Sequence, residues 1–304
     1  MKQSFSIKDI KLLKYLLTKS QKHLLELLNE FLSKNYKNVI KNEKFLCAEG
    51  NIPIALVAHL DTVYEVMPTT IFYDPEMEAM WSPQGLGADD RAGVFAIIQI
   101  IKHGFRPHII LTTDEEIGGI GASALAEMGN PFKDLRYIIE LDRQGYDDCV
   151  FYQCGNLDFQ DYIETFDFKY ACGSFSDISI ICPKWDIAGV NLSVGYFNEH
   201  TSSEHLLVGI LKETIDKVEN MLCEDGIPHF DFQAYTAVKK VYCQGCKQVV
   251  NEEDSICIKD VNGRSSYYCE KCLEHLCWCQ DCGDIYMCME GDNGLFCPSC
   301  RKAM

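Results

Sequence analysis

Hydrophobic residues recur along this chain with two different spacings. Near the N-terminus they lie three or four positions apart, which predicts amphipathic helices at Ile7–Leu17 and from Ser20 to about Lys34, with Ser20 as the N-cap of the second. Further along, short uninterrupted apolar runs predict buried strands, as at Ile54–Val57, Ile109–Leu111 and Tyr137–Ile139.

Helical patterns separate and follow these apolar runs. They extend from Arg91 to about His103, from about Ala122 to Met128, and from about Ser203 to Cys223. Strands that alternate with helices predict an α/β fold, in which a mixed and mostly parallel sheet is flanked by helices.

Five short segments place carboxylates or imidazoles near the ends of predicted strands. They are His59-Leu60-Asp61, Gly87-Ala88-Asp89-Asp90, Asp114-Glu115-Glu116, Glu140-Leu141-Asp142 and His200-Thr201. In open α/β sheets, sites form at the carboxyl ends of the strands. We therefore expect these side chains to converge at one edge of the sheet.

The residue types match the requirements of a two-metal hydrolase. Two divalent cations about 3.5–4 Å apart need a shared carboxylate and terminal ligands of imidazole and carboxylate type. A carboxylate that is not a ligand must accept a proton from the attacking water, and the adjacent Glu115 and Glu116 suit this division. Asp61 can accept the proton of the other ring nitrogen of His59 and fix its orientation.

In the same order, the motifs resemble those of the co-catalytic zinc exopeptidase superfamily, which contains peptidase T, related dipeptidases and deacylases, and the dizinc aminopeptidases. The resemblance covers about residues 1 to 225 and rests on His59-Leu60-Asp61, Gly87–Gly93, Asp114–Gly119, Leu141-Asp142 and His200–Glu204.

This resemblance implies a role for each residue. Asp89 would bridge two metal ions, which would be zinc, with cobalt or manganese as alternatives. One ion would take His59 and Asp142, and the other Glu116 and His200. Glu115 would be the general base, and Asp61 the partner of His59. The family pattern of His, a small hydroxyl residue, two more residues and Glu favours His200 over the alternative His205.

The chain departs from part of this superfamily. Peptidase T and the deacylases insert a lid and dimerisation domain before the last histidine, but the interval from Asp142 to His200 has room only to complete the sheet. In this respect the chain is more similar to the single-domain dizinc aminopeptidases. Ser176-Asp177, followed by the apolar Ile178–Ile181, resembles a segment that they carry before the final strand.

Some neighbouring residues have simpler explanations. Asp90 and Arg91 open a predicted helix, where an acidic residue is ordinary capping. Gly118, Gly119 and Gly121 fit either a tight turn or an anion-binding turn.

Cysteine density rises sharply near the C-terminus, where 11 of the 17 cysteines follow residue 240. Two repeated halves each contain two Cys-x-x-Cys pairs, which supply four thiolates for a closed tetrahedral zinc site. The pattern predicts two zinc ribbons or treble-clef-like knuckles, with the ligands Cys243, Cys246, Cys269, Cys272, Cys279, Cys282, Cys297 and Cys300. With Asp231–Val238 as a linker, we expect a hydrolase domain over residues 1–232 and a zinc-ribbon domain over residues 233–304.

Disulfides are not expected from the sequence. Met1–Leu17 interrupts its apolar residues with charged ones, unlike a signal peptide, and a cytoplasmic chain should keep its thiols reduced. Cys257, Cys277, Cys288 and His275 are left over, so a ligand set that borrows one of them remains open. The other cysteines are expected to be small buried apolar residues, namely Cys47, Cys149, Cys154, Cys172, Cys182 and Cys223.

The charge of the chain restricts its partners. A net charge of -17 argues against nonspecific binding to DNA or to anionic membranes. Residues 239–304 carry 8 Lys and Arg against 10 Asp and Glu, so nucleic acid is an unlikely ligand of the ribbons as well. Contact with a protein partner, or structural support, fits the ribbons better.

Together these patterns predict a cytoplasmic dizinc hydrolase that cleaves a peptide bond at a free N-terminus, as an aminopeptidase does. An N-acyl amino acid deacylase or dipeptidase of the same superfamily is the alternative within the enzymes. A binding protein that uses its ribbons on a hydrolase-fold platform is the alternative outside them, although the intact ligand positions argue against it.

Overall fold

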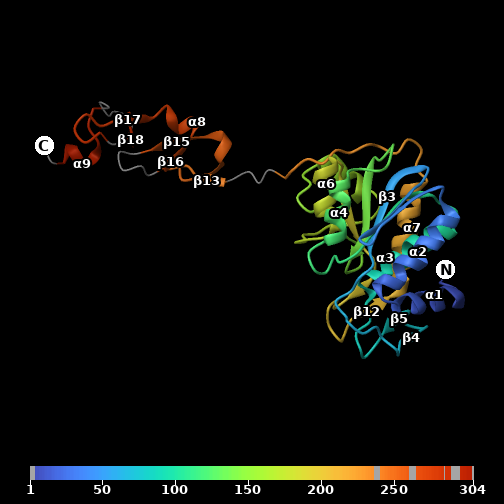
Figure 1. Ribbon diagram of the computed structural model, residues 1–304. Coiled ribbons are helices and arrows are strands. Elements are labelled where there is room, and N and C mark those ends of the chain that lie inside the picture. Colours follow the sequence, from blue (N-terminus) through green and yellow to red (C-terminus); the bar gives the residue numbers. More distant parts are fainter. Residues whose placement is uncertain (1–3, 236–239, 260–264, 284, 289–294, 303–304) are drawn as a thin grey trace. The chain divides into compact units, whose positions relative to one another are not determined.

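The computed structural model describes residues 4–235, 240–259, 265–283, 285–288 and 295–302 of the 304-residue chain. The chain forms two compact units, Met1–Tyr235 and Thr236–Met304 (Figure 1). Within the described residues, no helix is both long enough and apolar enough to cross a membrane.

An eight-stranded mixed sheet forms the centre of the first unit. Its strands lie in the order β1 (Asn38–Lys41), β2 (Phe45–Glu49), β6 (Pro107–Thr112), β3 (Ile52–His59), β7 (Tyr137–Arg143), β10 (Gly189–Ser193), β8 (Asp148–Val150) and β9 (Lys169–Tyr170). The central strands β6, β3, β7 and β10 are parallel, whereas β2 and β8 join them in antiparallel register. The predicted mixed, mostly parallel sheet is therefore confirmed.

Helices cover both faces of this sheet (Figure 1). One face carries α3 (Ala88–Lys102), α7 (Val208–Leu222), α1 (Ile7–Leu17), α2 (Gln21–Asn35) and α5 (Leu157–Glu164), and the other carries α4 (Ile120–Met128) and α6 (Asp177–Trp185). Successive residues of a strand point to opposite faces, so Leu56 of β3 packs in the first apolar core and Val57 in the second. The buried apolar runs of the sequence arise from this two-sided cover.

The two N-terminal helices begin as the sequence predicts. The Ser20 side chain accepts a hydrogen bond from the His23 amide, and Ser6 and Asp9 form a capping box before α1. The last helix was expected from about Ser203 but begins at Val208, because β12 (His205–Leu207) pairs with β5 (Ala79–Trp81). These strands belong to a small antiparallel sheet with β11 (Tyr196–Phe197) and β4 (Phe72–Asp74).

Much of the predicted linker packs against the first unit. The Gly155 amide donates to the Gln233 carbonyl at 2.5 Å, and the Tyr235 amide donates to the Gln153 carbonyl at 2.6 Å. Phe232 packs against the apolar core. The expectation of a linker at Asp231–Val238 was therefore wrong for residues 231–235, and residues 236–238 lie outside the described residues.

Among its described residues, the second unit contains three two-stranded antiparallel hairpins and short helices. The hairpins pair β13 (Lys240–Tyr242) with β14 (Val249–Asn251), β15 (Ser255–Lys259) with β16 (Ser265–Cys269), and β17 (Leu276–Trp278) with β18 (Ile285–Met287). A single helical turn η1 (Glu252–Asp254) precedes β15, while α8 (Glu270–Leu273) and α9 (Pro298–Arg301) follow cysteines. Among its described residues, the buried apolar side chains are few and most of them are cysteines.

Candidate metal centres

The first candidate centre lies at the carboxyl edge of the parallel strands. His59 ends β3, Asp142 lies near the end of β7, and Glu115 and Glu116 follow β6. Because these strands are adjacent and parallel, their carboxyl ends lie side by side. The structure thus brings together residues that lie far apart in the sequence, such as His59 and Asp142, which are separated by 83 positions.

Asp89 lies between two imidazoles. Its Oδ1 is 2.9 Å from Nε2 of His59, and its Oδ2 is 3.1 Å from Nε2 of His200. Asp142 Oδ1 lies 3.4 Å from the same His59 nitrogen, and Glu116 Oε1 lies 3.0 Å from the His200 nitrogen. One carboxylate therefore faces both halves of the centre, and each half has one further carboxylate and one imidazole.

His205, the alternative ligand, is positioned differently. It lies in β12, its Nδ1 is 3.2 Å from the Ser203 carbonyl oxygen, and its ring stacks on Phe197 with 5.4 Å between centroids. His200, in contrast, has a positive φ in the preceding loop and contacts two carboxylates of the centre.

Asp61 connects the two sides of the centre. Its Oδ1 lies 3.2 Å from Nδ1 of His59 and accepts the Glu115 amide at 3.0 Å, while its Oδ2 accepts the Glu116 amide at 3.0 Å. Burial acts to raise the pKa of Asp61, but the His59 ring and these amides lower it. An ionised Asp61 accepts the Nδ1 proton, which leaves the Nε2 lone pair of His59 directed at Asp89 and Asp142.

The pKa values of several residues at the centre differ strongly from their usual values. Burial and the neighbouring Asp142, against the opposing effect of His59, raise the pKa of Glu115 to about 8. Burial and Asp89 likewise raise the pKa of Asp142 to about 7. Hydrogen bonds to Asp89 and Glu116 raise the pKa of His200 to about 10. Ligand atoms of His59, Asp90 and Asp142, and likewise those of His59, Asp89 and Glu116, lie within 4.8 Å of one another, so each group could hold a metal ion.

Asp90 and Arg91 have larger roles than ordinary capping. Asp90 does cap the helix, since its Oδ1 accepts the Gly93 amide at 2.9 Å, but its Oδ2 also accepts the His59 amide at 3.3 Å. Arg91 is 1% exposed, and its guanidinium donates to the carbonyls of Lys19, at 3.0 Å, and of Asp61. The peptide bond between Asp89 and Asp90 is cis.

Glu204 is a supporting residue whose role the sequence did not reveal. Its Oε2 accepts the Gly87 amide at 2.7 Å, and its Oε1 accepts the amides of Ala88 at 2.7 Å and Asp89 at 3.1 Å. Glu204 is 1% exposed. The carboxylate therefore holds the turn that carries Asp89 to the loop that carries His200. Its place in the His200–Glu204 motif was the only signal for it.

Two further carboxylates lie buried behind the centre. Glu140 accepts a hydrogen bond from Ser176, and Asp177 accepts one from Thr112. Glu140 Oε1 and Asp177 Oδ1 are buried without a hydrogen-bond partner in the part of the chain that the structure describes. Asn191 fills the space beside them, since its side-chain oxygen accepts the Asp142 amide at 2.9 Å and its Nδ2 donates to Ser176.

The tail contains two groups of four cysteines, each made from two Cys-x-x-Cys pairs. In the first, the Cys269 sulfur lies 3.7 Å from that of Cys243 and 3.9 Å from that of Cys246. In the second, the sulfurs of Cys282 and Cys297 are 3.7 Å apart. Four thiolates about 2.3 Å from one zinc ion would be about 3.8 Å from one another, so both groups fit zinc.

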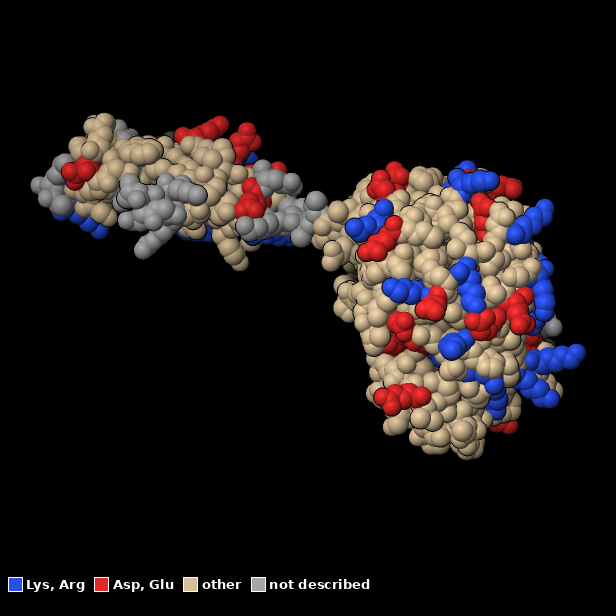
Figure 2. Space-filling view, in the orientation of Figure 1, with Lys and Arg blue, Asp and Glu red and all other residues tan. Residues whose placement is uncertain are grey.

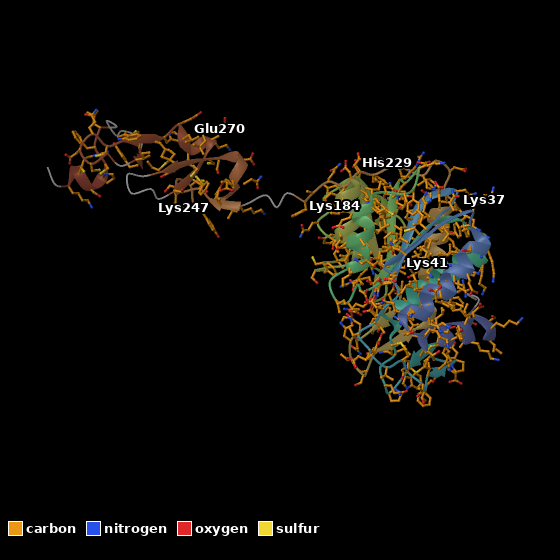
Figure 3. All side chains as sticks on the ribbon, viewed as in Figure 1. Lys37, Lys41, Lys184, His229, Lys247 and Glu270 are labelled. Carbon is orange, nitrogen blue, oxygen red and sulfur yellow. A yellow bond between two sulfur atoms is a disulfide. The ribbon has the colours of Figure 1, made fainter. Side chains whose placement is uncertain are left out.

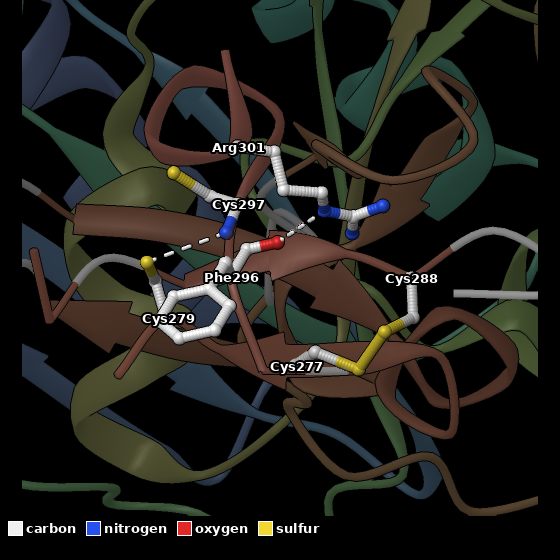
Figure 4. The surroundings of a disulfide bond; sticks show 6 residues. All are labelled: Cys277, Cys279, Cys288, Phe296, Cys297 and Arg301. Carbon is white, nitrogen blue, oxygen red and sulfur yellow. Dashed lines mark hydrogen bonds between the residues drawn. A yellow bond between two sulfur atoms is a disulfide. The ribbon is translucent and has the colours of Figure 1, made fainter. Parts of the chain in front are cut away.

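Backbone amides favour the thiolate form of one cysteine in each group. Amides of Cys282 and Cys297 lower the pKa of Cys279 to about 6, and Figure 4 shows the Cys297 amide donating to the Cys279 sulfur. Burial acts to raise the pKa of Cys243, but the amide of Cys269 and others lower it to about 6. Burial and neighbouring thiols raise the pKa of Cys272 to about 12, and Asp281 and neighbouring thiols raise the pKa of Cys300. Of the residues labelled in Figure 3, Lys247 directly follows the first ligand pair of this first group, and Glu270 lies within its second pair.

Two expectations about the remaining cysteines were wrong. Cys277 in β17 and Cys288, directly after β18, form a disulfide (Figure 4), whereas no disulfide was expected from the sequence. Adjacent hairpin strands bring these sulfurs together, which no local pattern reveals. Cys172 and Cys223 are exposed rather than buried, while Cys47, Cys149, Cys154 and Cys182 are buried as expected.

Known structures resemble the first unit. A tripeptidase from Staphylococcus aureus superposes with a TM-score of 0.55 at 15% identity, covering 69% of this chain and 95% of that one. Aminopeptidase PepT from Bacillus cereus gives 0.52 at 15% identity, with 69% and 96% covered. TET1 peptidase from Pyrococcus horikoshii gives 0.50 at 15% identity, with 72% and 99% covered.

No protein-family model matches the chain, and no curated protein matches it significantly. At this level of sequence identity, the structural likeness shows a shared fold. The first unit therefore has the α/β fold found in these peptidases.

Proposed function

We propose that the first unit is a metal-dependent peptide hydrolase that acts on small peptides with a free N-terminus. The observation that carries this proposal is the position of Asp89, whose two oxygens face His59 and His200 separately. Asp142 and Glu116 would complete the ligand set, and Glu115 would remain outside it. The shared peptidase fold supports the same assignment.

The chain's own residues would control the proton transfers. Two divalent cations held by this ligand set would polarise the scissile carbonyl and activate a water molecule. Glu115 would accept a proton from that water and then donate it to the nitrogen of the leaving amine. Asp61 would hold both the His59 ring and the Glu115 amide, which keeps the base aligned with the centre.

The fold also supports an exopeptidase without a lid domain. Between β7 and β10, the chain contains only β8, α5, β9 and α6, which complete the sheet and its cover.

For the tail, we propose two structural zinc ions and a role in binding a protein partner. The sulfur separations support the metal assignment, as do the backbone amides that lower the pKa of Cys243 and of Cys279. Nucleic acid is an unlikely partner, because the chain as a whole has a net charge of -17. On the face of the first unit shown in Figure 2, acidic and basic side chains are interspersed.

Metal analysis and a substrate panel test the proposal together. The purified protein should contain about four metal ions, and it should hydrolyse unblocked aminoacyl peptides faster than their N-acetylated forms. Faster cleavage of N-acyl amino acids would instead support the deacylase alternative. Glu127→Gln, at an exposed position of α4, is a matched control for substitutions of Glu115. Metal confined to the tail together with no hydrolysis would refute the enzyme assignment.

A further inference from the structure

Large apolar side chains are exposed directly beside the proposed base. Ile117, Ile120 and Phe175 are 70%, 38% and 42% exposed, and the partly buried Ile180 lies among them. We call these four residues the apolar patch. Exposed apolar groups of this size next to a polar centre are typical of a binding surface.

The backbone brings the patch close to the centre. The amides of Gly118 and Gly119 donate to the Glu115 carbonyl at 2.9 and 3.0 Å, so the chain turns back immediately after the base and the adjacent ligand. Ile117 lies in this turn, one residue after Glu116, and Ile120 begins α4.

The other half of the patch packs onto the same turn. A Cβ atom on Gly119, whose φ is +66°, would lie 2.6 Å from Cδ1 of Ile180 and 3.0 Å from Cζ of Phe175. The absence of a side chain at Gly119 thus lets these two residues contact the turn. Segments about 60 residues apart in sequence therefore meet at the turn that follows Glu115 and Glu116, and together they form one apolar surface there.

The direction of proton transfer decides which part of a substrate meets this surface. Glu115 can protonate the leaving nitrogen only within hydrogen-bond distance, about 2.6–3.2 Å. The residue that carries this nitrogen must then lie on the side of Glu115, whereas the acyl part of the substrate extends away from it. From this geometry, and resting on the proposed hydrolase function, we propose that the apolar patch binds the side chain of the residue on the leaving side of the cleaved bond.

The chemistry of the patch selects the kind of side chain. Ile117, Ile120, Phe175 and Ile180 offer only hydrocarbon contacts, which favours leucine, isoleucine, methionine or phenylalanine at this position. Asp177 Oδ1 would lie 3.6 Å from a Cβ on Gly119, so a carboxylate is close beneath the surface. An acidic side chain on the leaving residue would meet both this carboxylate and Glu115.

A series of peptide amides with a constant N-terminal residue tests the inference. The substrates are dipeptide amides with leucine at the N-terminus and a varied second residue, which is the leaving residue. We expect kcat/KM to be at least about tenfold higher when the leaving group is leucinamide than when it is glycinamide, and lowest when it is aspartyl amide. An N-acetyl amino acid series tests the same side if the enzyme is a deacylase, because the amino acid is again the leaving group.

Variants of the patch provide the decisive comparison. Ile117→Ser and Phe175→Ser should lower the leucinamide-to-glycinamide ratio by at least about threefold, whereas Phe175→Leu should preserve it. Ile40→Ser, at a 42% exposed position of the edge strand β1, should leave the ratio unchanged. A ratio within one enzyme is independent of how much of that enzyme is folded.

The same experiments distinguish a failure of the apolar-patch proposal from a failure of the hydrolase proposal. If the wild type cleaves the series with a ratio near one, or if both serine variants keep the wild-type ratio, the inference about the patch is overturned while the hydrolase assignment stands. If no member of either series is cleaved by the metal-loaded protein, the proposed function fails and the inference fails with it.

Discussion

Glu204→Gln tests how the centre is supported rather than how it reacts. The substitution keeps the size of the side chain but leaves a single acceptor oxygen. If that oxygen replaces Oε1, it still accepts the amides of Ala88 and Asp89, but the Gly87 amide loses its 2.7 Å partner and faces an NH2 group.

The size of the effect follows from these contacts. Hydrogen bonds to a charged group contribute about 1.5–3 kcal/mol each, and a buried unsatisfied donor costs about 1–3 kcal/mol. We expect Glu204→Gln to lower the free energy of unfolding by about 2–4 kcal/mol. Because the carboxylate positions the turn that carries Asp89, metal affinity should fall about 10–100-fold.

Two measurements check this prediction. Titration of the metal-free protein with zinc in a competing chelator gives the affinities of the first centre and of the cysteine groups, of which only the first should change, and urea unfolding with and without metal gives the stability. Glu127→Gln makes the same chemical change on the surface of α4 and should match the wild type in both. If Glu204→Gln also matched the wild type in zinc affinity, Glu204 would not hold the Asp89 turn in the way its hydrogen bonds indicate.

Glu115→Gln should reduce turnover about 10²–10⁴-fold with unchanged metal content, whereas Asp89→Ala should lose cleft metal; wild-type turnover in both variants would refute the assigned roles. A chain ending at Tyr235 should fold and still bind the metal ions proposed for the first centre, because the first unit is compact by itself. Circular dichroism and elemental analysis check this, and an unfolded product would show that the tail is required. Asp9→Asn tests the ion pair between Asp9 and Lys102. Burial acts to raise the pKa of Asp9, but Lys102 lowers it to about 2. The stabilisation that the ionised Asp9 contributes is therefore present above the usual carboxyl pKa of 3.8 and is lost as the pH falls through about 2. Urea unfolding should show a deficit of about 0.5–1 kcal/mol at pH 7 that shrinks in acid, and a deficit independent of pH would exclude the ion pair.

The sequence predicts those features that depend on short stretches of chain. The apolar run at Ile54–Val57 predicts its strand because a strand covered on both faces needs no polar alternation. The cap at Ser20 and the helix that it begins are equally local. The positions of His59 and Asp142 near strand ends follow from the same runs, which is why their convergence could be predicted.

The features that the sequence missed depend on partners far away in the chain. The strand His205–Leu207 exists because it pairs with Ala79–Trp81, and without that partner its residues resemble the start of a helix. The disulfide between Cys277 and Cys288 requires two hairpin strands to be placed first. The sequence around Asp90 predicts only a helix cap. The hydrogen bond that Asp90 accepts from the His59 amide forms between two separate segments, so it becomes visible only in the folded chain.

The bonds between Glu204 and the turn at Gly87–Asp89 also set an order of events during synthesis. They join residues 115 to 117 positions apart. At about 5–20 residues per second, a ribosome needs about 6–23 s to add that length of chain. During this interval the acidic turn has been made but lacks the carboxylate that orders it, and His200 is also missing for nearly as long. The proposed metal ions of the first unit could therefore bind their complete ligand set only after nearly all of that unit has emerged, whereas each cysteine group of the tail spans 22 to 30 residues and is synthesised within seconds.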